Sequence, residues 1–517
     1  MFRNKIFCFY TVLLFLLQSC SGVSNAKFSE ELPPIWPDYT FVTVPVNIAP
    51  LNFGIKDYIH YDKMSVIVKN EGGETVLTSS GDHASFGLRR WHRLLSNVAG
   101  GKLTFHVSVK TAGEWVAYSP FEVYVSRDSI DYGLTYRMIP PGYQSFGHMG
   151  IYERTLSSYK EKTLVDTRMI DSGCINCHTQ NRTDPSKFSI HIRGKHPATY
   201  MYLDGKEECL NTVTDSTKGF FVYPYWHPSG KYIAYSINAT RQSFYSSAEK
   251  VLEVYDENSD VIVYCPETHE VLRPVLTNRP DKFETKPAFS ADGRTLYFSV
   301  SDGGILPRDI KRMKYSLCSL SFDPDTKEFG DKVDTLLSAS QYNKTFISPR
   351  PSYDGKYLLV TVADFGTFLI HHNESDLWLY NVSTGEFRNA GGINSDDSES
   401  FHNWSSNSKW AVVSSRRDDG LYTRLYLAHF NEEKAMFDKA FLLPQKDPCV
   451  YYTSLIYSYN APDFTSGPVP LDANKLRKQV ISPVRQSVRA REWSPREKEL
   501  YDPSSMDAVS GASLAAE

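Results

Sequence analysis

The sequence predicts an all-β protein, in which an N-terminal immunoglobulin-like β-sandwich is followed by a five- or six-bladed β-propeller. Three observations carry this prediction. Aromatic residues, which pack well on pleated sheets, make up 14% of the 517 residues. Short apolar runs alternate with turn signals near the N-terminus, without a helical period between them. One hairpin pattern recurs along the rest of the chain, as expected of a repeat architecture.

The overall composition excludes some classes of protein. Lys and Arg total 56 against 60 Asp and Glu, so the formal net charge is −4. Without a basic excess to neutralise phosphates, nucleic acid is not an expected partner. The hydrophobic fraction of 41% is high enough for large cores and too high for a disordered chain.

The first residues are typical of a secretory signal peptide. Arg3 and Lys5 precede an apolar run from Ile6 to Leu17, which is too short to remain in a bilayer as a spanning helix. The run ends in Leu-Gln-Ser-Cys20, which resembles a bacterial lipobox and implies that Cys20 is lipidated. We therefore expect a signal peptide at 1–19, a linker at 20–35, and an anchor in the outer membrane of a bacterial envelope, facing the periplasm. An ordinary signal peptide with a chance cysteine is the alternative.

The sandwich is expected over residues 36–128. Strand-like runs there include Phe41–Val44, Met64–Val68, Leu103–Val109 and Phe121–Val125, with turn residues between them. Strands spaced in this way are typical of an immunoglobulin-like sandwich. No catalytic pattern lies in this region, so an adhesion or packing role is expected.

The propeller is expected over residues 132–460. A strand, a tight polar turn and a second strand recur as Trp226–Ala234, Phe289–Tyr297, Pro351–Leu359 and Trp404–Val412. The glycine in three of these turns requires a positive φ. A further hairpin follows each copy, and two hairpins make the four antiparallel strands of one blade.

Two more blades are less regular in sequence. An early copy places Cys174–His178 on its first strand, with its second strand at Phe188–Arg193. A hairpin at Gly150–Val165 is expected to belong to a sixth blade, completed by Tyr451–Tyr459. Closing such a ring removes the exposed edges of its sheets.

The repeats resemble those of TolB-like periplasmic proteins and of prolyl-oligopeptidase propellers. This resemblance rests on the strand–turn–strand motif and implies an architecture rather than an activity. The segments Tyr136–Tyr143 and Ser172–His178 also look like a group of Bacteroidetes lipoproteins that are loosely labelled as cytochrome-related.

The chemistry-bearing motif is Cys174-x-x-Cys177-His178. Two thiols at this spacing with an adjacent imidazole form the sequence signature of covalent haem c attachment. Cys174 and Cys177 would be the thioether anchors and His178 the proximal ligand of the iron. Two alternatives remain open: a disulfide between the two cysteines, and a zinc site that adds His178, His191 or His196.

A haem iron has a sixth coordination position, which a second side chain can fill. Candidates near the motif in sequence are His191, His196, Met201, His148 and Met149. A methionine there raises the reduction potential and a histidine usually leaves it lower. An open position would instead favour small-ligand binding or peroxide chemistry.

The sequence therefore favours an anchored envelope protein that carries a c-type haem and transfers electrons to, or serves as redox partner of, other envelope proteins. The alternative is a non-catalytic binding scaffold in which the CxxC is a disulfide or metal staple. No nucleophile turn, nucleotide-binding loop or H-E-x-x-H motif occurs, so an enzyme is not favoured. The pairing of Cys209, Cys265, Cys318 and Cys449 is not predicted, and the tail 461–517 is expected to be partly disordered, with a short helix at Leu471–Val480.

Overall fold

The structure is a computed structural model that describes residues 25–56, 60–140, 148–171, 173–214, 217, 219–245, 252–454 and 456–500. Cys20, the signal peptide and the end of the tail lie outside these residues. The chain divides into two compact units. Unit 1 comprises Met1–Ser129, Ser157–Tyr159 and Phe441–Leu455; unit 2 comprises Ile130–Leu156, Lys160–Ala440 and Ile456–Glu517.

Unit 1 is built on one seven-stranded sheet with the central order β1-β8-β7-β5-β6, to which β3 and β9 add. The strands are β1 (Lys27–Phe28), β3 (Thr43–Val44), β5 (Lys63–Lys69), β6 (Thr75–Gly81), β7 (Lys102–Thr111), β8 (Glu114–Ala117) and β9 (Phe121–Val125). Alternate residues of β5 are buried, as expected where one sheet face covers a core. The expected immunoglobulin-like sandwich is not shown, because the only other sheet among the described residues of this unit is the pair β2 (Ile35–Trp36) and β4 (Gly54–Ile55).

A helix that the sequence analysis did not predict, α2 (Leu88–Asn97), completes the core of unit 1. It buries Trp91, Leu94 and Leu95, which share one helical face. The Trp91 ring stacks on Phe86, which in turn meets the edge of Phe105 from β7. The segment with α4 (Pro448–Ser454), expected in the propeller, also belongs to this unit, where the Lys446 carbonyl accepts a hydrogen bond from Asn52.

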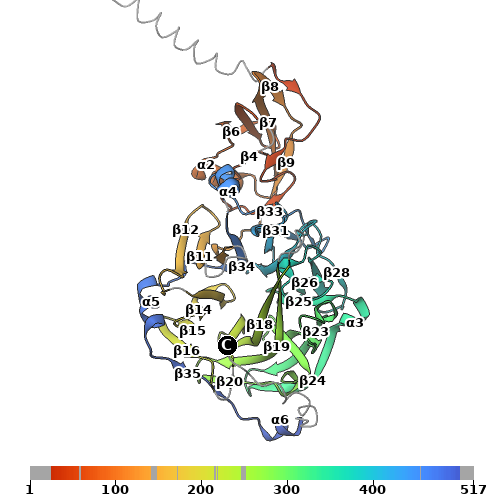
Figure 1. Cartoon of the computed structure of the whole chain (residues 1–517). Coiled ribbons are helices and arrows are strands. Elements are labelled where there is room, and N and C mark those ends of the chain that lie inside the picture. Colours follow the sequence, from red (N-terminus) through yellow and green to blue (C-terminus); the bar gives the residue numbers. More distant parts are fainter. Residues whose placement is uncertain are drawn as a thin grey trace, which may run out of the picture. The chain divides into compact units, whose positions relative to one another are not determined.

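The described residues of unit 2 form six small antiparallel sheets with four main strands each, consistent with propeller blades (Figure 1). Five of them follow one another along the chain. These are β13 (Cys174–Asn181), β14 (Asp184–Arg193), β15 (Ala198–Leu203) and β16 (Lys206–Asn211); β17 (Phe221–Trp226), β18 (Ile233–Phe244), β19 (Leu252–Cys265) and β20 (Glu270–Leu272); β21 (Lys282–Phe289), β22 (Thr295–Asp302), β23 (Ser316–Asp323) and β24 (Glu328–Leu337); β25 (Thr345–Pro351), β26 (Tyr357–Ala363), β27 (Asp376–Asn381) and β28 (Phe387–Asn389); and β29 (Glu399–Trp404), β30 (Trp410–Ser415), β31 (Arg424–Asn431) and β32 (Met436–Phe437).

The sixth sheet joins the two ends of unit 2. Its order is β12-β11-β10-β34, so a late strand pairs with three early ones. These strands are β10 (Gly133–Ile139), β11 (Gly150–Thr155), β12 (Glu161–Asp166) and β34 (Ser458–Thr465). The expected hairpin at 150–165 is confirmed as part of this sheet, but the closing strand begins at Ser458, since Tyr451 lies in α4.

The sheets contact one another through their first strands and bury apolar side chains between them. β13 contacts β17, and the contacts continue through β21, β25 and β29 to β34, which contacts β13. The core between the sheets of β11 and β13 includes Ile151, Ile175 and Phe188, while the core between the sheets of β13 and β17 includes Met201 and Phe221. Because each sheet buries both faces against its neighbours, the circuit of first strands encloses a centre.

The first strand of every sheet carries a bulge with one residue in the left-handed region. These residues are Cys177, Tyr223, Lys286, Ser348, Phe401 and Ala461. Their φ values lie between 44° and 56°, and the pairing register shifts beside each of them. The next residue is proline in four strands (Pro224, Pro287, Pro349 and Pro462) and histidine in two (His178 and His402). Proline is tolerated inside a sheet at such bulges, because no ladder hydrogen bond is required there.

The polar turns predicted from the repeated motif are confirmed. Gly230, Gly293 and Gly355 have φ values of 68°, 76° and 75°, and Ser408 in the weakest copy has 58°. A side chain at Gly293 would place its Cβ 2.1 Å from the imidazole of His227, so glycine is required there by space as well as by backbone conformation.

The described part of the tail runs along the outside of two sheets. Helix α5 (Ala473–Ile481), close to the expected helix, starts at the Asp472 cap, and β35 (Gln486–Ser487) and β36 (Arg489–Ala490) pair with β16 and β20. Helix α6 (Pro495–Leu500) follows. Just before it, the Trp493 indole donates a hydrogen bond to the Arg273 carbonyl. The tail thereby covers two sheet edges that would otherwise be open.

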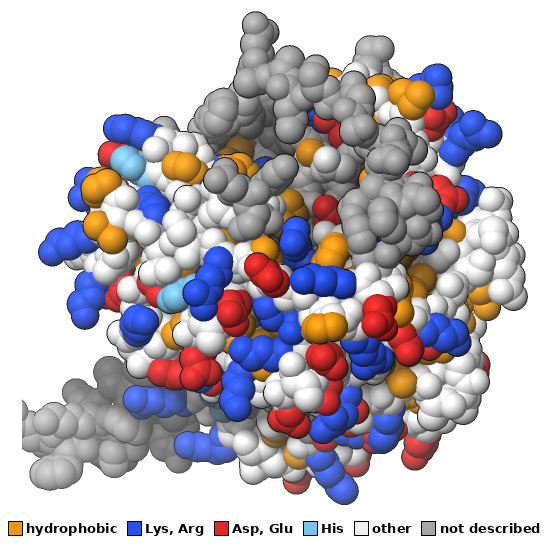
Figure 2. Space-filling model, turned by 90° about the horizontal axis from the view of Figure 1, so that it is seen from below, with side chains coloured by type: hydrophobic (Ala, Val, Ile, Leu, Met, Phe, Trp, Pro, Cys, Tyr) orange, Lys and Arg blue, Asp and Glu red, His pale blue; other side chains and the backbone are white. Residues whose placement is uncertain are grey.

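The face of the molecule seen from below carries side chains of both charges (Figure 2). Figure 2 shows basic and acidic side chains interspersed on the face seen from below, rather than a single basic field. In the part of the chain that the structure describes, no helix combines the length and the apolar content needed to cross a membrane.

Candidate functional site

The CxxCH motif lies on β13, the first strand of its sheet, and spans the bulge. In an uninterrupted strand, successive side chains point to opposite faces of the sheet. The left-handed residue Cys177, with a φ of 45°, lies between Cys174 and His178 and interrupts this alternation. A bulge commonly re-aims a side chain in this way.

Both thiols of the motif are free, as are those of Cys209, Cys265 and Cys318. The Arg137 guanidinium donates to the Cys174 sulfur at 3.8 Å, and the same nitrogen lies 3.7 Å from the Met149 sulfur. Burial raises the pKa of the Cys177 thiol, and the backbone N–H of Tyr223 partly offsets this effect. Neither sulfur is therefore committed to a bond within the chain.

His178 is buried without hydrogen bonds. Its side chain belongs to a residue that is only 5% exposed, and neither ring nitrogen has a hydrogen-bond partner. The ring stacks on Phe188, with the ring centroids 6.0 Å apart. Burial lowers the pKa of His178 to about 4 and outweighs the opposing effect of the Thr135 backbone, so the imidazole is neutral at pH 7.

His402 occupies the equivalent position in the sheet of β29 and provides an internal comparison. One of its ring nitrogens lies 2.8 Å from the Leu359 carbonyl oxygen, and the other lies 3.3 Å from the Thr361 hydroxyl. Burial lowers its pKa to about 3. The fold can thus satisfy a histidine at this position, and it does so at His402 but not at His178.

The structure places two of the five candidate distal ligands beside the motif. Met149 shares the Arg137 guanidinium with Cys174. His191 lies on β14 directly opposite Asn176, where one ring nitrogen accepts a hydrogen bond from Arg193 at 3.1 Å and the other has no partner. Burial lowers the pKa of His191 to about 3, so this ring is neutral as well.

The other three candidates have different surroundings. His148 lies 3.2 Å from the Asp166 carboxylate, and His196 lies 3.6 Å from that of Asp171. Met201 is fully buried in the apolar core, where its sulfur lies 3.9 Å from the Tyr235 hydroxyl. None of the contacts described for these three side chains is with Cys174 or Cys177.

Two arginines at the motif were not singled out from the sequence. Arg137 contacts Cys174 directly, and Arg193 pairs in register with Cys174 at the end of β14. Both guanidinium groups favour the charged form of the Cys177 thiol. Their positions near the motif depend on the pairing register of the strands. This register could not be predicted from the sequence, because this copy of the repeat is irregular.

A small chamber lies next to the motif, where the first strands meet. It has a volume of about 60 Å³, room for a few water molecules. Its lining comes from five of the six first strands and consists of His178, Thr179, Pro224, Tyr225, Ser348, Arg350, Phe401, His402, Asn403, Ala461, Pro462 and Asp463. The Asp463 carboxylate accepts hydrogen bonds from Asn403 at 2.6 Å and from Thr179 at 3.1 Å. Burial raises the pKa of Asp463 to about 7.

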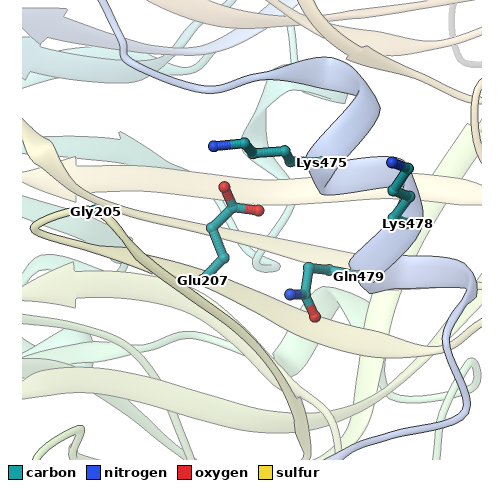
Figure 3. A pocket seen from close by; sticks show the side chains of 5 residues that line it. All are labelled: Gly205, Glu207, Lys475, Lys478 and Gln479. Carbon is teal, nitrogen blue, oxygen red and sulfur yellow. The ribbon is translucent and has the colours of Figure 1, made fainter.

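A second hollow lies on the outside of unit 2, between α5 and the turn from β15 to β16. Figure 3 shows the Lys475 and Glu207 side chains pointing toward one another, while the Lys478 amine is turned away. The hollow has a volume of about 270 Å³ and is open to solvent. Its lysines are exposed, so solvent screens their charge and no specific ligand is indicated.

The residues at the motif can be compared with the donors that zinc and haem take from a protein. Structural zinc takes four tetrahedral ligands. Among the described residues, no group of three or more His, Cys, Asp or Glu side chains is arranged to hold a metal ion. From the motif itself, thioether attachment of a haem takes two reduced thiols and one imidazole, and Cys174, Cys177 and His178 are residues of those types. The described chamber beside His178 has a volume of only about 60 Å³, which is far smaller than a porphyrin.

Comparison with known proteins assigns the chain to no family. No family model matches it, and no curated protein matches its sequence. Solved structures show distant similarity to the β-propeller domains of prolyl endopeptidase and dipeptidyl peptidase 4.

The likeness to a prolyl endopeptidase has 12% identity and a TM-score of 0.33, covering 60% of this chain and 42% of that one. For Porphyromonas gingivalis dipeptidyl peptidase 4 the values are 9%, 0.31, 60% and 50%. A DUF4784 family protein from Bacteroides caccae has 9% identity and a TM-score of 0.28, with 72% of this chain and 97% of that one covered. The chain thus spans half or less of either peptidase.

Proposed function

We propose that the chain is a six-bladed β-propeller protein of the cell envelope that carries one c-type haem on its CxxCH segment and transfers electrons to or from envelope partners. The observation that carries the proposal is His178, a buried neutral imidazole with two unpartnered nitrogens beside two free thiols. Leaving a buried polar group unpaired costs about 1–3 kcal/mol. Ligation of an iron would remove that cost for one of the two ring nitrogens.

Each residue of the motif has a defined role in this proposal. Cys174 and Cys177 form the thioether bonds, and His178 is the proximal ligand. When bound, a haem supplies one-electron redox chemistry. Arg137 and Arg193 place positive charge next to the sulfurs, and they would pair with the carboxylate groups that a haem carries.

The distal ligand determines the reduction potential. Met149 and His191 are the two candidates that lie at the motif. His191 has one ring nitrogen free for an additional bond, while Arg193 holds the other. We therefore favour His191, which would give a lower potential than methionine.

The proposed location follows from the N-terminus. A lipidated Cys20 would anchor the chain in the outer membrane, on the periplasmic side, where haem attachment to CxxCH takes place in bacteria. Labelled palmitate should be incorporated into the wild type and not into Cys20→Ala. Incorporation into Cys20→Ala, or none into the wild type, would contradict the anchor.

A second candidate function is a TolB-like binding scaffold without haem, in which the CxxC is a disulfide or metal staple. The enclosed chamber between the first strands favours it, because arginine, asparagine and aspartate side chains converge there. In that case the two thiols would be found oxidised to one another or bound to a metal in the purified protein.

Haem staining of denaturing gels separates the two functions. The full chain is produced in a host with cytochrome c maturation, together with Cys174→Ala, Cys177→Ala and the control Cys318→Ala, which changes a buried cysteine in the sheet of β23. We expect full covalent stain in the wild type and in the control, and a marked decrease in both motif variants, each of which keeps only one of the two thiols. Equal staining of all four chains, or of none, would contradict the proposal.

A further inference from the structure

The closing strand β34 carries a buried carboxylate that is hydrogen-bonded to two other first strands. Asp463 is only 6% exposed. One of its oxygens accepts a hydrogen bond from the side-chain amide of Asn403, on β29, at 2.6 Å. The other accepts from the Thr179 hydroxyl at 3.1 Å and from the Gln180 backbone N–H at 3.3 Å, both on β13. A single side chain therefore joins the closing strand to the first strands of the two sheets that it contacts.

The Thr179 hydroxyl lies between two acceptors. Its oxygen is 3.1 Å from Oδ2 of Asp463 and 3.4 Å from the Gln180 carbonyl oxygen. A hydroxyl has one hydrogen, which rotates to suit its surroundings, and two lone pairs. When Asp463 is ionised, the hydroxyl donates to the carboxylate. When Oδ2 carries a proton, that O–H can donate to Thr179, whose own hydrogen turns to the Gln180 carbonyl. The arrangement thus accommodates both protonation states of Asp463.

The surroundings of Asp463 favour the neutral acid up to neutral pH. Burial is the largest effect and raises the pKa of Asp463 to about 7. The hydrogen bonds from β13 and β29 oppose it, as does the Arg350 guanidinium on β25, which attracts the ionised carboxylate. The proton is therefore held by burial against a set of groups that stabilise the charge.

The other titratable side chains that face Asp463 from the surrounding elements are uncharged at pH 7, apart from arginines. Burial lowers the pKa of two histidines and raises that of two tyrosines, which are His178 on β13, His402 on β29, Tyr225 on β17 and Tyr353 after β25. Besides Arg350, positive charge comes from Arg182, whose guanidinium carbon lies 4.0 Å from the centre of the Tyr353 ring. On β10 the residue paired with Asp463 is Thr135, which does not titrate.

We propose that Asp463 and Thr179 form a proton-binding fastener of the ring, which holds β34 to β13 most firmly in its protonated state. The sign follows from the folded and unfolded chains. The pKa of Asp463 in the folded chain, about 7, lies above the ordinary value of 3.8, so the folded chain keeps a proton that the unfolded chain has lost. This contribution to stability is complete below about pH 3.8 and is lost as the pH rises through about 7. Acid therefore tightens the closure of the ring.

Urea unfolding of the full haem-free chain between pH 5 and pH 8.5 tests the fastener. The wild type is compared with Asp463→Asn, which cannot titrate but retains an oxygen that accepts hydrogen bonds. We expect the folding equilibrium constant of the wild type, relative to that of the variant, to fall about 10–100-fold from pH 5 to pH 7 and to stay level at higher pH. An equal pH dependence in the two chains would overturn the proposal. Because no haem is present, the result does not depend on the proposed haem function.

A second buried acid provides the matched control. Burial raises the pKa of Asp260, on β19, to about 6, and this residue does not line the chamber. Relative to the wild type, Asp260→Asn is expected to change the pH dependence only below about pH 6. If it removed the decline between pH 6 and pH 7 as Asp463→Asn does, that decline would not belong to Asp463 and the proposal would be wrong.

Asn403→Ala keeps the proposal testable if Asp463→Asn fails to fold. This variant retains the titrating carboxyl group and removes the donor at 2.6 Å, which favours the charged form. We expect the pKa of Asp463 to rise by about one unit, so the folding equilibrium constant relative to the wild type should fall about tenfold in total between pH 6 and pH 9. A constant ratio across this range would overturn the proposal.

Discussion

His178 and His402 occupy the same place in two copies of one structural repeat, yet their rings are treated differently. Each follows the left-handed bulge residue of a first strand, where the other four copies have proline. His402 makes contacts to Leu359 and Thr361, whereas His178 makes none through its ring nitrogens. Proline in four copies shows that the fold itself needs no side-chain nitrogen at this position.

This difference separates a structural role from a functional one. His402 stabilises its sheet because it satisfies a carbonyl and a hydroxyl that burial would otherwise leave unpaired. The His178 ring stacks on Phe188, but its two nitrogens lack such hydrogen-bond partners. We attribute this difference to the proposed ligand of one of these nitrogens.

The largest expected effect is that of His178→Pro. Because proline already follows the bulge in four sheets, this substitution is expected to leave the fold intact while it removes the proximal ligand completely. The haem, still held by its two thioethers, would then show an altered absorption spectrum in the purified protein. If circular dichroism showed that the variant is unfolded, His178 would instead be required for the folding of its strand.

The next effect concerns stability. His402→Leu leaves the Leu359 carbonyl and the Thr361 hydroxyl unpaired, so we expect a loss of about 2–4 kcal/mol in the free energy of unfolding. His178→Leu removes a ring that satisfies nothing and is expected to stay within about 1 kcal/mol of the haem-free wild type, or to exceed it. Urea unfolding of the haem-free proteins measures both values. Equal losses in the two variants would remove the distinction between the two histidines.

Acid sharpens the comparison through His402. Its folded-state pKa is about 3, below the ordinary value of 6.5, because burial disfavours the charged ring. Below pH 6.5 the unfolded chain binds this proton and the folded chain does not, so stability falls with decreasing pH, by about 1.4 kcal/mol per pH unit. His402→Gln retains a neutral donor for the Leu359 carbonyl. We expect it to lose about 2 kcal/mol less than the wild type between pH 7 and pH 5 in urea unfolding; an identical pH dependence would contradict this.

The smallest expected effect tests the bulge itself. Ala461, with a φ of 48°, is the bulge residue of β34. Glycine relieves strain of about 1–2 kcal/mol in the left-handed region, but its greater freedom in the unfolded chain costs about 0.5–1 kcal/mol. Ala461→Gly is therefore expected to raise stability by roughly 0.5 kcal/mol. A marked loss would show that the shared conformation is not strained.

The repeats of unit 2 could be predicted from short local signals. The turns at Gly230, Gly293 and Gly355 require a positive φ, and that requirement is visible in the sequence. The same is true of the hairpins that flank them. The sheet of β13 could also be placed among the repeats from the sequence, although the turn between its first two strands lacks the glycine of the repeated motif.

The remaining features depend on contacts between distant segments. The contact of Arg137 with Cys174 arises because β10 and β13 belong to neighbouring sheets, and no local pattern encodes that distance. Helix α2 buries Trp91, Leu94 and Leu95 on one face, so its amphipathic period is present in the sequence, although it was not recognised between the strand-like runs. That His178 occupies a position where other copies have proline becomes visible only when all six bulges are aligned. The sequence does contain the signal, because Tyr223, Lys286, Ser348 and Ala461 are each followed by proline.

The central claim is that Cys174, Cys177 and His178 hold an iron porphyrin. Its most direct test is the intact mass of the full chain, purified from a host that attaches haem to CxxCH segments, together with its visible spectrum in alkaline pyridine. The account predicts one haem per chain, bound covalently, with the absorption bands of a c-type haemochrome. A colourless protein with the mass of the polypeptide alone, or lighter by two hydrogens, would contradict it.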